Sequence, residues 1–165
     1  MDQWHDIFLA RAGAAGVLTR LVFVGVSINL QKIVSDPSSG LAGRAAEALI
    51  LLVAVLTASV LVLVPGQGAG VLGAELLVVG LAAWGWIVAI QLPRMREWTI
   101  MRADLRVSFV LRVVLGQVAT LTLVIAGVAV LWVGLGGLYW LVAGTVFSIV
   151  GALVDAWVLL VEINR

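Results

Sequence analysis

The sequence predicts an all-α polytopic membrane protein, a single transmembrane domain over residues 1–165 with five spans. Hydrophobic residues fill 63% of its positions and charged residues only 12%, and the mean hydropathy is +1.19. A soluble domain is about half apolar and about one-quarter charged. The apolar residues gather in runs of about 20, the length of helix that crosses bilayer hydrocarbon. Backbone groups in lipid need partners within their own segment, and the runs are too long for barrel strands of about 10 residues, so helices are expected.

The first expected span, residues 8–30, is the least apolar of the five because Arg11 and Arg20 interrupt it. One helical face gathers mostly small or polar residues: Gly13, Gly16, Arg20, Val24, Ser27 and Gln31. A charge within the bilayer needs polar or protein surroundings, so we expect this face to turn toward protein. The alternative is an amphipathic helix lying in the interface, which leaves four spans.

The four later spans are separated by turns rich in glycine and proline. They are expected at 45–64, 71–92, 107–133 and 138–161. Residues 35–40 form the first loop, Pro65 begins the second turn, and 134–137 form the last one. Aromatic residues beside this last turn, Trp132, Tyr139 and Trp140, are typical of interfacial anchors.

The basic loop, residues 93–106, orients the chain. Together with the start of the next span it carries five of the ten basic residues: Arg94, Arg96, Arg102, Arg106 and Arg112. Basic residues in short loops favour the cytoplasmic side. This places the N-terminus outside, the C-terminus in the cytoplasm and the chain in the inner membrane. Such a loop sets topology, and it can also hold anionic lipid headgroups or a cytoplasmic protein partner.

The last span carries a stripe of small and polar residues: Gly144, Ser148, Gly151, Asp155 and Glu162. Two interpretations stay open. In one, the stripe packs against another helix and Asp155 is neutralised by Arg20. In the other, it lines a pore or an ion-binding seam, to which Arg20 and Ser27 of the first span also contribute.

Two further groups of polar residues have structural and functional interpretations. Glu75, about 7 Å from the outer surface by helical rise, either reaches water or pairs with Arg11, or it attracts cations in a symmetric oligomer. Four residues of the cytoplasmic third could form one interhelical cluster: Asn29, Glu47, Gln117 and Asp155.

Several function classes are excluded or disfavoured by the residues present. The chain has no cysteine, so it has no disulfide, thiolate metal site or cysteine nucleophile. His5 stands between Asp2 and Asp6, which indicates an acidic surface patch more than a metal site. No nucleophile–base constellation is apparent, so we expect no enzymatic activity, catalytic residue, cofactor or metal, and the net charge of +1 gives no case for nucleic acid binding.

Four stretches of the N-terminal third are similar to a group of small bacterial multispan membrane proteins, some of which are labelled modulators of the membrane protease FtsH. They are Trp4-His5-Asp6, Ala12 to Gly16, Leu21 to Leu30 and Leu63 to Gln67. The resemblance covers about 65 residues and implies an accessory membrane protein, without transferring any functional residue.

These observations lead to two functional hypotheses. The first is a homo-oligomer that forms an ion-channel-like or transport pathway along its small and polar stripes. The second is a non-conducting accessory or regulatory protein, surrounded by membrane lipids, that acts on a membrane or cytoplasmic partner through its basic loop.

Overall fold

A computed structural model describes residues 2–28, 30–35, 40–96 and 103–162, and these residues form helices joined by short turns. The elements are α1 (Asp2–Ile28), α2 (Leu30–Ser35), α3 (Leu41–Leu63), α4 (Ala69–Arg96), α5 (Ala103–Val133), the 3-10 helix η2 (Gly134–Leu138) and α6 (Tyr139–Glu162). The prediction of an all-α protein is confirmed for the described part of the chain.

Four stretches are long and apolar enough to cross a membrane: Trp4–Ile28, Leu41–Leu63, Ala69–Met95 and Phe109–Leu159. The last of them contains 51 residues, because it comprises most of α5, the turn η2 and most of α6. At about 1.5 Å per residue, α5 and α6 are each long enough to match the hydrocarbon thickness.

The helices begin and end close to the predicted span limits and extend beyond several of them. Glycines with positive φ mark three of the boundaries: Gly40 (φ 70°), Gly66 (φ 74°) and Gly134 (φ 74°). Residues with a Cβ rarely adopt this conformation, so glycine permits the sharp reversal there. Helix α4 continues through Pro93 to Arg96, and α5 already starts at residue 103, so both helices extend beyond the predicted span limits at 92 and 107.

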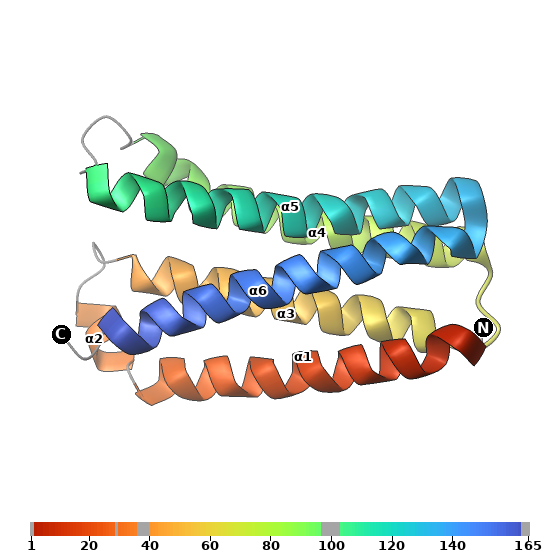
Figure 1. Cartoon of the computed structure of the whole chain (residues 1–165), viewed down its shortest axis with the longest axis horizontal. Coiled ribbons are helices and arrows are strands. Elements are labelled where there is room, and N and C mark those ends of the chain that lie inside the picture. Colours follow the sequence, from red (N-terminus) through yellow and green to blue (C-terminus); the bar gives the residue numbers. More distant parts are fainter. Residues whose placement is uncertain (1, 29, 36–39, 97–102, 163–165) are drawn as a thin grey trace.

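The long helices run side by side with alternating direction (Figure 1). The N-terminal end of α1 lies at the same end of the bundle as the α3–α4 connection and η2 (Figure 1). The start of α1 lies beside the start of α6, because the ring centre of Trp4 is 4.8 Å from that of Tyr139. The opposite end carries α2, the start of α3, the end of α4 and the end of α6 (Figure 1).

Glycines bring α4 and α5 into close contact. A Cβ atom at Gly127 would lie 2.6 Å from the backbone nitrogen of Leu77, and one at Gly80 would lie 2.9 Å from that of Val124. Small residues at such positions let helices in lipid approach closely and gain dispersion energy. Helices α3 and α6 pack against this closely associated pair, and α1 packs against α3 and α6.

The half of the bundle near the N-terminus is filled mostly with apolar side chains, although Arg11 is buried there too. The core there contains Phe8 from α1, Ala58 from α3, Leu76 from α4, Leu123 from α5 and Leu141 from α6. Ser59 is buried beside this core, and its hydroxyl donates to the carbonyl of Val55 in the same helix. The polar side chains that contact one another between helices gather in the other half of the bundle, as described next.

Candidate functional site

Four charged side chains meet between α3, α5 and α6. Nε of Arg112 donates to Oε2 of Glu47 over 2.7 Å, and the two side chains are only 6% and 2% exposed. Oδ1 of Asp155 lies 3.7 Å from Nε of Arg112 and 3.7 Å from Nη1 of Arg44. The two guanidinium groups balance the two carboxylates, so this cluster is neutral as a whole when all four groups are ionised.

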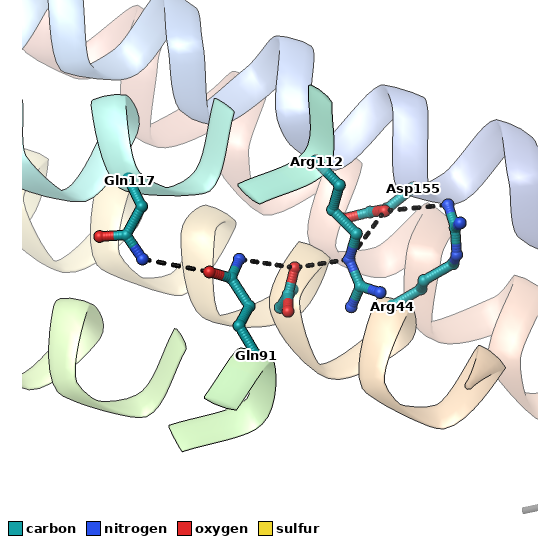
Figure 2. Close-up of polar contacts among 6 residues, drawn as sticks. Arg44, Gln91, Arg112, Gln117 and Asp155 are labelled. Atoms are coloured by element: carbon teal, nitrogen blue, oxygen red, sulfur yellow. Dashed lines mark hydrogen bonds and ion pairs between the residues drawn. The ribbon is translucent and has the colours of Figure 1, made fainter. Parts of the chain in front are cut away.

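Two amides and an indole extend the cluster toward the middle of the bundle. Nε2 of Gln91 faces Oε2 of Glu47 at 3.5 Å, and Nε2 of Gln117 donates to Oε1 of Gln91 over 3.1 Å. Oε1 of Gln117 accepts from Nε1 of Trp84 over 2.8 Å. Figure 2 shows the labelled side chains in one row, from Gln117 to Arg44. We call these seven residues the polar network: Arg44, Glu47, Trp84, Gln91, Arg112, Gln117 and Asp155.

Glycines make room for the long polar side chains. A Cβ atom at Gly116 would lie 3.1 Å from Nε2 of Gln91, and one at Gly43 would lie 3.6 Å from Nη2 of Arg112. The cavity beside Glu47 and Asp155 holds only about 10 Å³. That is about the smallest volume that accepts one water molecule, so the network is closely packed.

Four of the five residues in the stripe predicted on the last span face the interior of the bundle, while the side chain of Glu162 lies outside the described residues. Gly144, Ser148, Gly151 and Asp155 are all buried. A Cβ atom at Gly151 would lie 3.2 Å from Cδ1 of Leu51. The hydroxyl of Ser148 has no hydrogen-bond partner among the described residues. Within one copy of the chain, this stripe is a packing face of α6.

The expected pair of Arg20 and Asp155 is wrong, because Asp155 faces Arg44 and Arg112 instead. Arg20 is exposed on the outer side of α1. Val22 is buried, and two residues correspond to about 160° around a helix, so Arg20 must point away from the neighbouring helices. Within one copy of the chain, this face of α1 therefore does not turn toward protein.

The other residues of that face are open as well. Gly13 and Ser27 are exposed, and the hydroxyl of Ser27 donates to the carbonyl of Phe23 over 2.8 Å. A Cβ atom at Gly13 or Gly16 would meet nothing within 4 Å. The small and polar face of α1 is thus available to lipid or to another protein.

The suggested pair of Glu75 and Arg11 is not formed. Glu75 accepts a hydrogen bond from the amide of Gln67 in the preceding turn. Arg11 is buried, and among the described residues its guanidinium has no hydrogen-bond partner, but it lies 4.5 Å from the ring centre of Phe8. A cation–π contact in a desolvated place is worth about 2 kcal/mol, so the ring offsets part of the cost of burying this charge.

The five arginines grouped by the sequence have different settings. Arg112 belongs to the polar network, whereas Arg94 lies at the end of α4 and its guanidinium fills the space that a side chain at Gly40 would take. Arg106 is half-buried. Arg102 and the side chain of Arg96 lie outside the described residues.

The predicted interhelical cluster of the cytoplasmic third is largely present. Glu47, Gln117 and Asp155 all belong to the polar network, while Asn29 lies outside the described residues. Gln91 was not predicted to belong to this cluster. Its position was a usable signal, since a polar amide stands near the end of an otherwise apolar run.

No family model matches the chain, and no curated protein or solved structure does. The site is therefore interpreted from its own geometry. Among the described residues, no group of three or more His, Asp and Glu side chains could hold a metal ion. Within the polar network, Glu47 accepts a hydrogen bond from Arg112, and Asp155 lies 3.7 Å from two arginines, an arrangement that favours structural cross-linking between helices.

Proposed function

We propose that the chain is a five-span integral membrane protein of the inner membrane, with its N-terminus outside and its C-terminus in the cytoplasm. A 51-residue apolar stretch that turns at η2 supports two crossings, by α5 and by α6. The excess of basic residues at the opposite end of the bundle supports the orientation.

Cysteine labelling in intact cells tests this topology, since the chain has no cysteine of its own. Gln67→Cys and Gly136→Cys react with a membrane-impermeant maleimide added outside. Met95→Cys, whose parent side chain is 51% exposed, reacts only after the cells are opened. Protection of position 136 in intact cells contradicts an outward-facing turn between α5 and α6, and so contradicts their two crossings.

The geometry favours the accessory hypothesis over conduction through a single copy. The observation that carries this proposal is the division of the bundle into two halves. The polar network occupies one half and ends at the indole of Trp84, which donates and cannot accept a proton. The other half holds the apolar core around Phe8 and Leu141, and Arg11, which is buried beside Phe8, has no hydrogen-bond partner among the described residues that would join it to the network. Ions require a continuous polar path, so this arrangement suits a rigid scaffold.

In this proposal the network fixes α3, α4, α5 and α6 relative to one another and so positions the basic cytoplasmic face. A partner with an acidic surface binds that face. Replacing Arg96, Arg102 and Arg106 with glutamine together removes crosslinks between a photoreactive residue at position 95 and its partner. Arg20→Gln removes the same type of charge outside this face and leaves the crosslinks unchanged. Equal crosslinking in both variants contradicts the role of the basic face.

A second candidate function is favoured by the open face of α1. Several copies assembled through Gly13 and Gly16 would surround a pathway lined by Arg20 and Ser27. Arg20 lies near the middle of such a pathway, so its charge favours anions there. Arg20→Glu then reverses the ion selectivity of the purified oligomer, and no current in either protein rejects this candidate.

A further inference from the structure

The face of α1 that points away from the bundle carries an unpaired charge. Arg20 is exposed there, and no hydrogen bond or ion pair joins it to a described residue. It lies eight residues before Ile28, the end of the apolar stretch Trp4–Ile28, which places it about 12 Å inside the membrane in the proposed topology. Charged side chains at such depths are rare and almost always pair with another group.

The geometry of α1 directs this side chain toward the middle of the membrane. Cα–Cβ bonds in a helix tilt toward the N-terminus, so the side chain of Arg20 leaves the backbone in the direction of Trp4, the farther end of the stretch. The centre of the stretch lies at Gly16, four residues or about 6 Å in that direction. A negative group at mid-depth therefore suits this guanidinium better than a headgroup beyond Ile28.

Two glycines open the same face to a neighbouring helix. Gly13 and Gly16 stand seven and four residues before Arg20, and a Cβ atom at either glycine would meet nothing within 4 Å. Between helices in lipid, small residues let the backbones approach closely. Val17 is 70% exposed and Val24 is 46% exposed, so apolar surface surrounds the charge. We call these five residues the docking face: Gly13, Gly16, Val17, Arg20 and Val24.

A second copy of the chain does not supply the missing negative charge. Copies inserted in the same orientation place Arg20 beside Arg20 when they pair through the docking face, and like charges repel. The described spans contain four acidic residues, Asp6, Glu47, Glu75 and Asp155. Glu47 and Asp155 are 2% and 3% exposed and contact arginines of the polar network. Asp6 and Glu75 lie within two turns of the starts of α1 and α4, at the end of the bundle that holds the N-terminus (Figure 1). A complementary carboxylate therefore has to come from another protein.

We propose that the docking face binds a transmembrane helix of another protein, one with an aspartate or glutamate near the middle of the membrane. The carboxylate pairs with Arg20, and the glycines let the two helices close over the pair and exclude lipid. The proposal rests on the crossing of α1 in the topology proposed above. It gives the accessory role a second surface, because α3 and α6 separate α1 from α4 and α5 (Figure 1). A helix docked here occupies the face that the oligomeric pathway would use, so the two exclude each other.

Photocrosslinking to a model helix in phosphatidylcholine vesicles tests the pairing. The probe is a peptide of about 24 leucine and alanine residues, long enough to cross the bilayer, with one aspartate at its centre. A photoreactive residue replaces Val17 in the full chain, and in a control it replaces Val78, which is 66% exposed on α4. Position 17 captures the aspartate probe about tenfold more than an asparagine probe, an advantage of about 1.4 kcal/mol. Position 78 captures the two probes equally.

Substitutions in the docking face separate its charge from its shape. Arg20→Gln removes the preference for the aspartate probe, and Arg20→Glu captures a probe with a central arginine instead. Gly16→Leu lowers capture of the aspartate probe, because the new side chain blocks the close approach of the two helices. Gly85→Leu on α4 is the matched control and leaves capture unchanged. A Cβ atom at either glycine meets nothing within 4 Å, so both variants keep the fold.

Equal capture of the aspartate and asparagine probes at position 17 overturns the proposal, as does a preference that survives Arg20→Gln. Crosslinks to lipid alone assign the face to the bilayer, and crosslinks between two copies assign it to self-association, and either result overturns the proposal. Labelling of His5→Cys, at an exposed position, tests the crossing of α1 separately. Its protection from an impermeant maleimide in intact cells overturns the topology and the docking together, whereas labelling without capture of the probe overturns the docking alone.

Discussion

Replacing Arg112 with methionine is the change that most directly perturbs the polar network. Arg112 contacts both Glu47 and Asp155, and its side chain is 6% exposed. Without it, two buried carboxylates share the single guanidinium of Arg44, and Glu47 keeps only the amide of Gln91. Breaking a buried pair by removing one partner costs about 3–5 kcal/mol, so we expect the free energy of unfolding to fall by about 3 kcal/mol.

Combining Arg112→Met with Glu47→Met in a double variant separates the effect of charge balance from the simple loss of contacts. Glu47→Met alone leaves an excess positive charge, and we expect it to cost about 3 kcal/mol as well. In the double variant, Arg44 and Asp155 still balance each other and methionine fills the vacated space. The double variant should therefore lose at most about 3 kcal/mol in place of about 6, which is a coupling energy of at least about 3 kcal/mol.

Reversible unfolding in mixed micelles, followed by fluorescence of the seven tryptophans, measures these free energies. Arg20→Met is the control, since this arginine is exposed and lies outside the polar network, and removing a charge that faces lipid should not lower the free energy of unfolding. Additive effects of the two single substitutions would refute the network as a coupled unit. So would an Arg112→Met protein as stable as the control.

Two further predictions concern the packing of α4 and α5 and the end of the network. Gly127→Ala should lower the free energy of unfolding by about 1–3 kcal/mol, because its Cβ would lie 2.6 Å from the backbone of Leu77, whereas Gly85→Ala, with nothing within 4 Å, should be neutral or stabilising by up to about 1 kcal/mol. Equal effects on the same unfolding curve would count against the close approach of these helices. Gln117→Leu should cost about 0.5–1.5 kcal/mol through the lost bond from Trp84, and a loss no larger than that of Arg20→Met would place the indole outside the network.

The helices were predictable because their apolar runs and glycine turns depend on local sequence. Expected limits such as 45–64 and 138–161 lie within a few residues of α3 and α6. The all-helical class and the membrane character follow from the same runs. The grouping of Glu47, Gln117 and Asp155 was also foreseeable, since they share a depth and polar side chains in lipid associate.

Pairings between helices were not predictable, because they depend on how each helix is rotated in the bundle. Arg20 has the same depth range as Asp155, but the rotation of α1 that buries Val22 turns Arg20 outward. Arg44 and Arg112 looked like topology signals at the ends of two spans, and only the packing of α3, α5 and α6 shows that they neutralise Asp155. The depth of a residue in the membrane can be estimated from the sequence. The direction in which its side chain points around the helix is known only once the helices are packed together.

The conductance of the purified protein in planar bilayers tests the central claim most directly, namely that the polar network is a closed structural element. Wild type and Asp155→Asn are compared across voltage, with folding and oligomer mass checked on the same samples. We predict that neither protein carries a current through the polar network, because the apolar core in the other half of the bundle offers ions no continuous polar path. A wild-type current whose ion selectivity changes in Asp155→Asn would contradict the claim and place Asp155 on an ion path.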